Sequence, residues 1–138
     1  MPSRLNPYIS FDGTAREAME FYRSVFGGTL VVNTFGEYGV EDPEQGKRVM
    51  HAMLETDGGY TIMAADTMPG MPHNPGDSVS VSLSGDDTEE LRGYWAKLAE
   101  GAQVATPLEK QVWGDEFGAC TDRFGVSWMV NIAGAAAG

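Results

Sequence analysis

The order of predicted elements occurs twice in this chain, and that repeat restricts the folds open to it. When the sequence is shifted by 73 residues, the first predicted helix aligns with the second. The aligned pairs are Ala18 with Leu91, Phe21 with Tyr94, Tyr22 with Trp95 and Val25 with Leu98. Displaced by 66 residues, one predicted hairpin lies on another and matches Gly59 with Gly125, Ile62 with Trp128 and Met63 with Met129. Self-similarity at a fixed displacement indicates a repeated structural unit. We therefore expect two modules of one kind.

The first half has the pattern of a strand, a helix and three further strands. Residues 6–11 are a strand candidate, and the helix begins at Thr14, where Glu17 completes a capping box. Apolar residues recur at helical spacing until Gly27-Gly28: Ala15, Ala18, Met19, Tyr22, Val25 and Phe26. Strands are predicted at 29–35, 48–56 and 60–65, with a hairpin turn at 57–59 and a polar loop at 36–47.

The second half repeats that order. The strictly alternating "SVSVSLS" at 78–84 predicts a strand, and 86–102 predicts an amphipathic helix that ends at Gly101. A strand at 103–109 precedes a hairpin whose turn holds 123–125 and whose last strand contains "GVSWMVN". The predicted modules are about 5–66 and 78–133, joined by a Pro- and Gly-rich linker at 67–77 and followed by a frayed tail at 134–138.

Each module, with one helix and four strands, is too small to bury a core comfortably by itself. The 138 residues suit a single domain, in which two modules packed side by side form one curved sheet. The predicted fold class is α+β, with two paired β-α-β-β-β modules around a cavity and the helices on the outer face. A cavity of that kind binds small molecules.

The charge of the chain restricts its partners. A net charge of −11 repels phosphate backbones and anionic lipid surfaces, so we expect neither nucleic-acid nor membrane binding. The single cysteine, Cys120, rules out an intrachain disulfide, and its place in the hairpin predicts a buried, unreactive side chain. The first ten residues lack the apolar run of a signal peptide, which favours a cytoplasmic protein.

Four stretches carry a family resemblance: "PYISFDGTAREAMEFYRSVFGG", "VMHAMLE", "WGDEFGACTDRFGVSW" and the last strand. Together with the paired modules they resemble the vicinal oxygen chelate superfamily, which includes glyoxalase I, extradiol dioxygenases and bleomycin-resistance proteins, and within it the PhnB-like branch. That branch is often named after a demethylubiquinone methyltransferase. The sequence has no glycine-rich methyl-donor loop after a strand, so this name receives little weight.

The resemblance implies a chelating site. Catalytic relatives place His and Glu metal ligands on the first and last strands of each module, and the metal acts there as a Lewis acid. The corresponding positions in this chain are near Asn6 (or Pro7), Met63, Ser80 and Met129. Thioethers suit soft Cu(I), whereas Asn and Ser are weak ligands for Zn²⁺, Ni²⁺ or Fe²⁺. We therefore expect no metal and no other cofactor at these positions, with a divalent metal held by atypical ligands as the disfavoured alternative.

Two residues are candidates for acid–base chemistry. His51 lies in the middle of a predicted strand, with Val49, Met53 and Glu55 on the same face. His51 and Glu55 are about 13 Å apart along a strand, too far to bind one ion together. Each remains a candidate general acid or base, and His51 is also open to a purely structural interpretation. A metal site built from His51 and His73 is the weaker possibility.

The expected cavity has polar and aromatic walls. Besides the residues already named, its predicted lining includes Tyr8, Ser82, Trp113, Phe117 and Asn131. Aromatic rings suit a planar ligand, and Asp115 suits a cation. Plain packing of these residues is an equal alternative.

Three functions follow from these features. The leading prediction is a small-molecule-binding homodimer that sequesters a compound, as bleomycin-resistance proteins do. The alternative is a lyase, isomerase or dioxygenase acting on a small oxygenated substrate through His51, Glu55 or an atypical metal. The third is an interaction module whose cavity is filled by Met63 and Met129.

Overall fold

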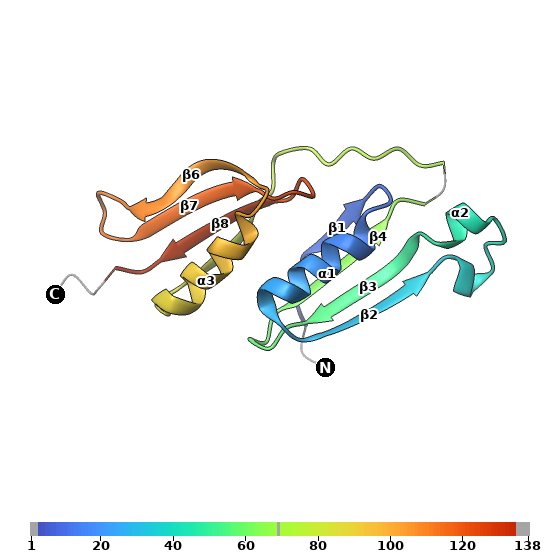
Figure 1. The fold of residues 1–138 in the computed structure, drawn as a ribbon, viewed down its shortest axis with the longest axis horizontal. Helices are drawn as coiled ribbons and strands as arrows, with labels where there is room; N and C mark the ends of the chain where they lie inside the picture. The colour runs from blue at the N-terminus through green and yellow to red at the C-terminus, as the bar shows by residue number, and fades with distance from the viewer. Residues whose placement is uncertain (1–2, 69, 135–138) are drawn as a thin grey trace. The chain divides into compact units, whose positions relative to one another are not determined.

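A computed structural model describes residues 3–68 and 70–134 of the chain (Figure 1). The chain divides into two compact units, Met1–Pro75 and Gly76–Gly138, and the division falls inside the predicted linker. Within the described residues, no helix has the length and apolar character needed to cross a bilayer. Each unit is described by itself.

Unit 1 contains a four-stranded mixed sheet with one main helix. Its elements are β1 Tyr8–Phe11, α1 Ala15–Phe26, β2 Thr29–Thr34, the 3₁₀ helix η1 Gly36–Tyr38, α2 Pro43–Gly46, β3 Val49–Glu55 and β4 Thr61–Asp66. The strand order is β1-β4-β3-β2, and only the β1–β4 pair is parallel. Unit 2 has β5 Val81–Gly85, α3 Thr88–Leu98, β6 Gln103–Lys110, β7 Glu116–Thr121 and β8 Ser127–Ile132, in the matching order β5-β8-β7-β6.

The prediction of an α+β fold with two β-α-β-β-β modules is confirmed. The two hairpins show the repeat most closely. Thr56 and Asp122 are both buried, and the carbonyl of each accepts the N–H of a glycine three residues later, Gly59 or Gly125, with φ near +90°. The single curved sheet around a cavity depends on how the modules pair, and it stays a prediction.

In each unit one helix covers one face of the sheet (Figure 1). Helix α1 buries the six residues that its apolar periodicity predicts: Ala15, Ala18, Met19, Tyr22, Val25 and Phe26. They pack with alternate strand residues such as Leu54, Ile62 and Ala64 to form the core of unit 1. Helix α3 buries fewer apolar residues, and Leu91, Leu98, Trp128 and Val130 form the centre of unit 2.

The predicted capping box at Thr14 is wrong. The Thr14 side chain makes no capping hydrogen bond. The helix start is instead capped by Asp66, whose Oδ1 accepts the N–H groups of Gly13 and Ala15 at 2.8 and 3.0 Å. Its Oδ2 accepts the N–H of Val49 at 2.8 Å. One buried carboxylate thus joins β4 to the starts of α1 and β3.

Asp122 also links separate groups through hydrogen bonds in unit 2. Its Oδ1 accepts the N–H groups of Phe124 and Val126, and its Oδ2 accepts the indole N–H of Trp128 at 2.8 Å. These hydrogen bonds hold the turn of the β7–β8 hairpin in place. Cys120 is buried nearby, and burial, with a smaller contribution from the charge of Asp122, raises the pKa of its thiol.

Several strand boundaries differ from the prediction. Strands β1 and β5 begin at Tyr8 and Val81, opposite Met63 and Trp128 near the starts of β4 and β8, so Asn6 and Ser80 precede the strands. A bulge between β2 and β3 turns Val49 into the core, away from the face of His51 where the alternation had placed it.

Two further segments differ from the prediction. The polar loop at 36–47 contains η1 and α2, and Asp42 caps α2 by accepting the N–H groups of Glu44 and Gln45. In the expected frayed tail, Gly134 is bound to Asp115 through its N–H, and 135–138 lie outside the described residues.

The cap on α1 predicts a sharp contrast in stability. Replacing Asp66 with Ala leaves three backbone N–H groups without their acceptor and should lower the free energy of unfolding by at least about 2 kcal/mol. Thr14→Ala should change it by less than about 0.5 kcal/mol, because that side chain caps nothing. Urea denaturation measures both variants. An equal or larger loss for Thr14→Ala would contradict the assignment of the cap to Asp66.

Gly118 in β7 makes room for helix α3. A Cβ built there would lie 3.0 Å from the ring of Trp95 and from the backbone of Leu108. Gly118→Ala should therefore cost about 1–3 kcal/mol of unfolding free energy. Gly93→Ala, on an open part of the same helix as Trp95, should stabilise by up to about 1 kcal/mol. Urea titrations of the two variants should move in opposite directions.

Candidate functional site

The candidate residues lie mainly on the sheet faces that the helices leave open. In β4 the even-numbered residues Ile62, Ala64 and Asp66 are buried, so Met63 belongs to the opposite face. The same alternation in β8 buries Trp128 and Val130 and places Met129 and Asn131 on the open face. Each unit therefore carries its own set of candidate binding residues.

On the open face of unit 1, Tyr8, His51 and Met63 come together. Tyr8 is the direct neighbour of Met63 across the parallel β1–β4 pair. The rings of Tyr8 and His51 lie 5.9 Å apart between centroids and are tilted by 43°. Tyr8 is 55% exposed, so this aromatic surface is accessible. Glu55 lies on the same face at the exposed end of β3, four residues from His51.

On the open face of unit 2, Phe117 pairs with Asn131 across β7 and β8, and Ser82 pairs with Met129 across β5 and β8. The Trp113 ring lies 6.3 Å from that of Phe117, at 58°, and Trp113 is 60% exposed. The structure thus brings Trp113, Phe117 and Asn131 into one cluster.

Asp115 adds a fixed negative charge to this cluster. Asn131 Nδ2 donates to its Oδ2 at 3.0 Å, and the Gly134 N–H donates to its Oδ1 at 2.8 Å. These hydrogen bonds, that of Asn131 first, with a further one from the Trp113 side chain, lower the pKa of Asp115 below its usual value. The carboxylate is thus favoured in its ionised form next to Trp113, whose ring contacts Phe117, and this arrangement suits a cation.

The positions expected to match the ligands of metal-binding relatives hold no carboxylate or imidazole. The cross-strand neighbours of Met63 and Met129 are Tyr8 and Ser82, two residues beyond the predicted Asn6 and Ser80. Among the residues that the structure describes, no three His, Cys, Asp or Glu side chains lie close enough to hold a metal ion. His73 lies in the linker, where its Nε2 donates to the carbonyl of Ser10 at 3.1 Å. The absence of a metal in the protein stays a prediction.

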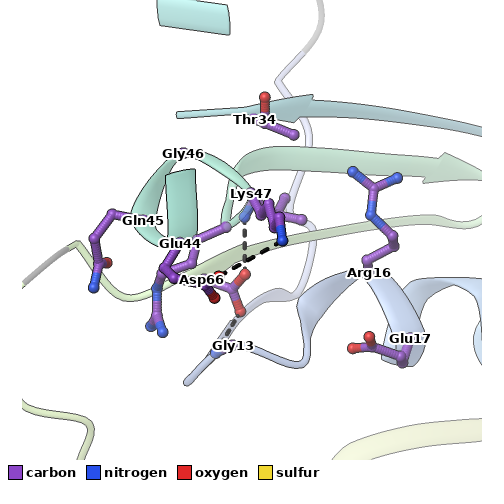
Figure 2. Close-up of a pocket in the computed structure, with 11 residues that line it drawn as sticks. Gly13, Arg16, Glu17, Thr34, Glu44, Gln45, Gly46, Lys47 and Asp66 are labelled. Carbon is purple, nitrogen blue, oxygen red and sulfur yellow. Dashed lines mark hydrogen bonds and ion pairs between the residues drawn. The ribbon is translucent and has the colours of Figure 1, made fainter. Parts of the chain in front are cut away.

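A pocket in unit 1 was missed by the sequence interpretation. It has a volume of about 710 Å³ and lies between the first turn of α1 and the segment around α2, on the helix side of the sheet (Figure 2). Its walls carry both signs of charge, and they are formed by Gly13, Arg16, Glu17, Thr34, Glu44, Gln45, Gly46, Lys47, Arg48, Val49 and Asp66. The Asp-Pro pair at 42–43 is typical of a helix start. This feature of the sequence could have indicated that residues 36–47 are ordered and form one wall of the pocket.

Comparison with known proteins places this geometry in a family. Residues 3–131 match the family model described as 3-demethylubiquinone-9 3-methyltransferase. The protein PA1353 from Pseudomonas aeruginosa is similar in structure, with a TM-score of 0.86 and 36% identity over 97% of this chain and 100% of that one.

Two further solved structures extend the comparison. A putative 3-demethylubiquinone-9 3-methyltransferase, PhnB protein, from Bacillus cereus has a TM-score of 0.77 and 25% identity over 95% of this chain and all of its own. A glyoxylase/bleomycin resistance protein/dioxygenase domain from Frankia has a TM-score of 0.67 and 16% identity, over 100% of this chain and 96% of that one. At this low identity the similarity establishes a shared fold and nothing further. Since the family match covers nearly the whole chain, the protein belongs to the PhnB-like 3-demethylubiquinone-9 3-methyltransferase family, with the fold of the glyoxalase and bleomycin-resistance proteins.

Proposed function

We propose that the protein binds a small planar, cationic molecule on its open sheet faces and sequesters it. The observation that carries the proposal is the cluster in unit 2, where the exposed Trp113 ring meets Phe117 beside the ionised Asp115. The exposed Trp113 ring lies against the half-buried Phe117 ring, so the two form an accessible aromatic surface rather than a single exposed side chain. A ligand that stacks on the rings and places its charge near Asp115 satisfies both features.

The chemistry of the open faces favours organic ligands over a chelated ion. Tyr8, Met53, Met63 and Met129 supply apolar, adaptable surface rather than hard metal ligands. His51, Ser82 and Asn131 supply hydrogen-bonding groups that orient a ligand. The net charge of −11 favours approach of a cation and disfavours nucleic acid. We propose binding without the standard metal of the wider superfamily.

We do not propose methyl transfer, although the family whose model matches is described as a methyltransferase. The chain has no glycine-rich loop after a strand that would hold a methyl donor. The corresponding turn, from β1 into α1, has its N–H groups at Gly13 and Ala15 already bound by Asp66. A cytoplasmic homodimer is the proposed form, on the precedent of small members of the superfamily.

A second candidate function is an enzyme acting on a small oxygenated substrate. The observation that favours it is the contact of His51 with Tyr8, which places an imidazole beside a phenol on an accessible face. His51 would serve as general acid or base, and a metal would have to come from ligands outside the usual positions.

The binding proposal predicts a response to a planar cation. The dye 9-aminoacridine should bind and quench tryptophan fluorescence. The substitution Trp113→Ala should lower the affinity for the dye about tenfold or more, because the stacking contact is lost. The substitution Asp115→Asn should lower the affinity for 9-aminoacridine, which is a cation at mildly alkaline pH. It should not change the affinity for the parent compound acridine, which is uncharged at that pH. Since the pKa of Asp115 is lowered, affinity should persist when the pH falls from neutral into the ordinary carboxylate range.

Tyr38→Ala is the matched control for dye binding. Tyr38 is an aromatic residue of similar exposure, 63%, in η1 rather than in the cluster, and its loss should leave affinity unchanged. Equal affinity of the wild type and Trp113→Ala for 9-aminoacridine would contradict the proposed site.

Metal content separates the two candidate functions. Native mass spectrometry of freshly purified protein should give the mass of two chains, and elemental analysis of the same sample should find no stoichiometric metal. About one Zn, Ni, Fe or Mn per site would contradict the binding proposal and favour the enzyme. The ligands would then be sought first at His51 and Glu55.

A further inference from the structure

We propose that the pocket of unit 1 is a second binding site, specific for a small zwitterion that carries a carboxylate and an ammonium group. It is formed by unit 1 alone, on the helix side of the sheet, and does not depend on the open-face site proposed above. Figure 2 shows Arg16 and Glu17 on one side of the pocket, the residues around α2 on the other, and Asp66 between them.

Arg48 provides a fixed guanidinium group with bonding capacity to spare. Its Nη2 is held by Asp12 Oδ1 and Thr67 Oγ1, both at 2.9 Å, and its side chain is only 20% exposed. The other terminal nitrogen, Nη1, lies beside Gly13, at 3.4 Å from where a Cβ would stand, and has no acceptor among the described residues. The absent side chain at Gly13 leaves this nitrogen at the pocket wall, where a carboxylate oxygen can reach it.

Arg16 occupies a position that is electrostatically unfavourable for a cation. It lies in the first turn of α1, where the positive end of the helix dipole disfavours a cation, and it pairs with no carboxylate in the described part of the chain. Glu17, its neighbour on α1, has no cationic partner there either. The pocket thus contains an unpaired cation, an unpaired anion and an unused guanidinium N–H.

The remaining charges of the pocket are already compensated. Lys47 pairs with Glu44 at 3.6 Å, and the Asp66 carboxylate accepts three backbone N–H groups. The three cations Arg16, Lys47 and Arg48 equal the three carboxylates Glu17, Glu44 and Asp66 in number, so a simple anion gains little net attraction. A zwitterion satisfies both unpaired groups, with its carboxylate between Arg16 and Arg48 and its ammonium on Glu17.

Three small probes test this assignment on the full-length protein. Glycine carries both charges, acetate only the carboxylate and methylammonium only the cation. In ¹H–¹⁵N spectra, glycine should shift the amide signals of Gly13 and Gly46 in a saturable way. Acetate and methylammonium should each bind more weakly than glycine by a factor of about ten or more. Arg16→Gln and Glu17→Gln should each weaken glycine binding about tenfold.

Arg23→Gln is the matched control, since Arg23 lies in the last turn of the same helix and does not line the pocket. It should leave glycine affinity unchanged. Acetate binding as tightly as glycine, an undiminished response in Arg16→Gln, or no shift with glycine at molar concentration would each overturn the proposal. Trp113→Ala should bind glycine like the wild type, so failure of the open-face site is distinguishable from failure of this one.

Discussion

One helix can cover only one face of a four-stranded sheet, and this constraint decides where the other features of each unit lie. Helices α1 and α3 bury the apolar face of their own sheets, so alternate strand residues are directed to the opposite face, which no described helix of the same unit covers. That second face holds Tyr8, His51 and Met63 in unit 1 and Phe117, Met129 and Asn131 in unit 2. The binding residues are therefore a product of the same alternation that builds the core.

The two units use one plan with different side chains. At corresponding positions Tyr22 and Ala52 in unit 1 become Trp95 and Gly118 in unit 2, so a larger ring on the helix meets a smaller residue on the strand. Asp66 at the end of β4 corresponds to the buried Ile132 at the end of β8, and helix α3 is capped by its own Asp87. The two copies keep one backbone plan but differ in their polar anchors and, separately, in the side chains of their open faces.

The sequence predicted features that depend on local pattern. The buried face of α1 follows from spacing within twelve residues, and the hairpins follow from glycines at 59 and 125 that need positive φ. It did not predict the cap on α1, because Asp66 is 51 residues from Ala15 and no local pattern joins them. The bulge near Val49 depends on the partner strand, and the pocket depends on four separate segments of the chain. For the open faces, sequence alternation named the residues, but only the fold shows that Trp113, Phe117, Asp115 and Asn131 meet.

The parallel pairs impose an order on folding. Strand β1 pairs with β4 between Tyr8 and Met63, and β5 pairs with β8 between Ser82 and Met129, whereas the hairpins β3–β4 and β7–β8 join neighbouring segments. Loop closure favours the hairpins early, and the first strand of each module must wait for a partner synthesised long after it. On the ribosome, β1 and α1 therefore emerge without the strand that completes their sheet and the aspartate that caps their helix. The sheet of each module can therefore be completed only after its last strand has been synthesised.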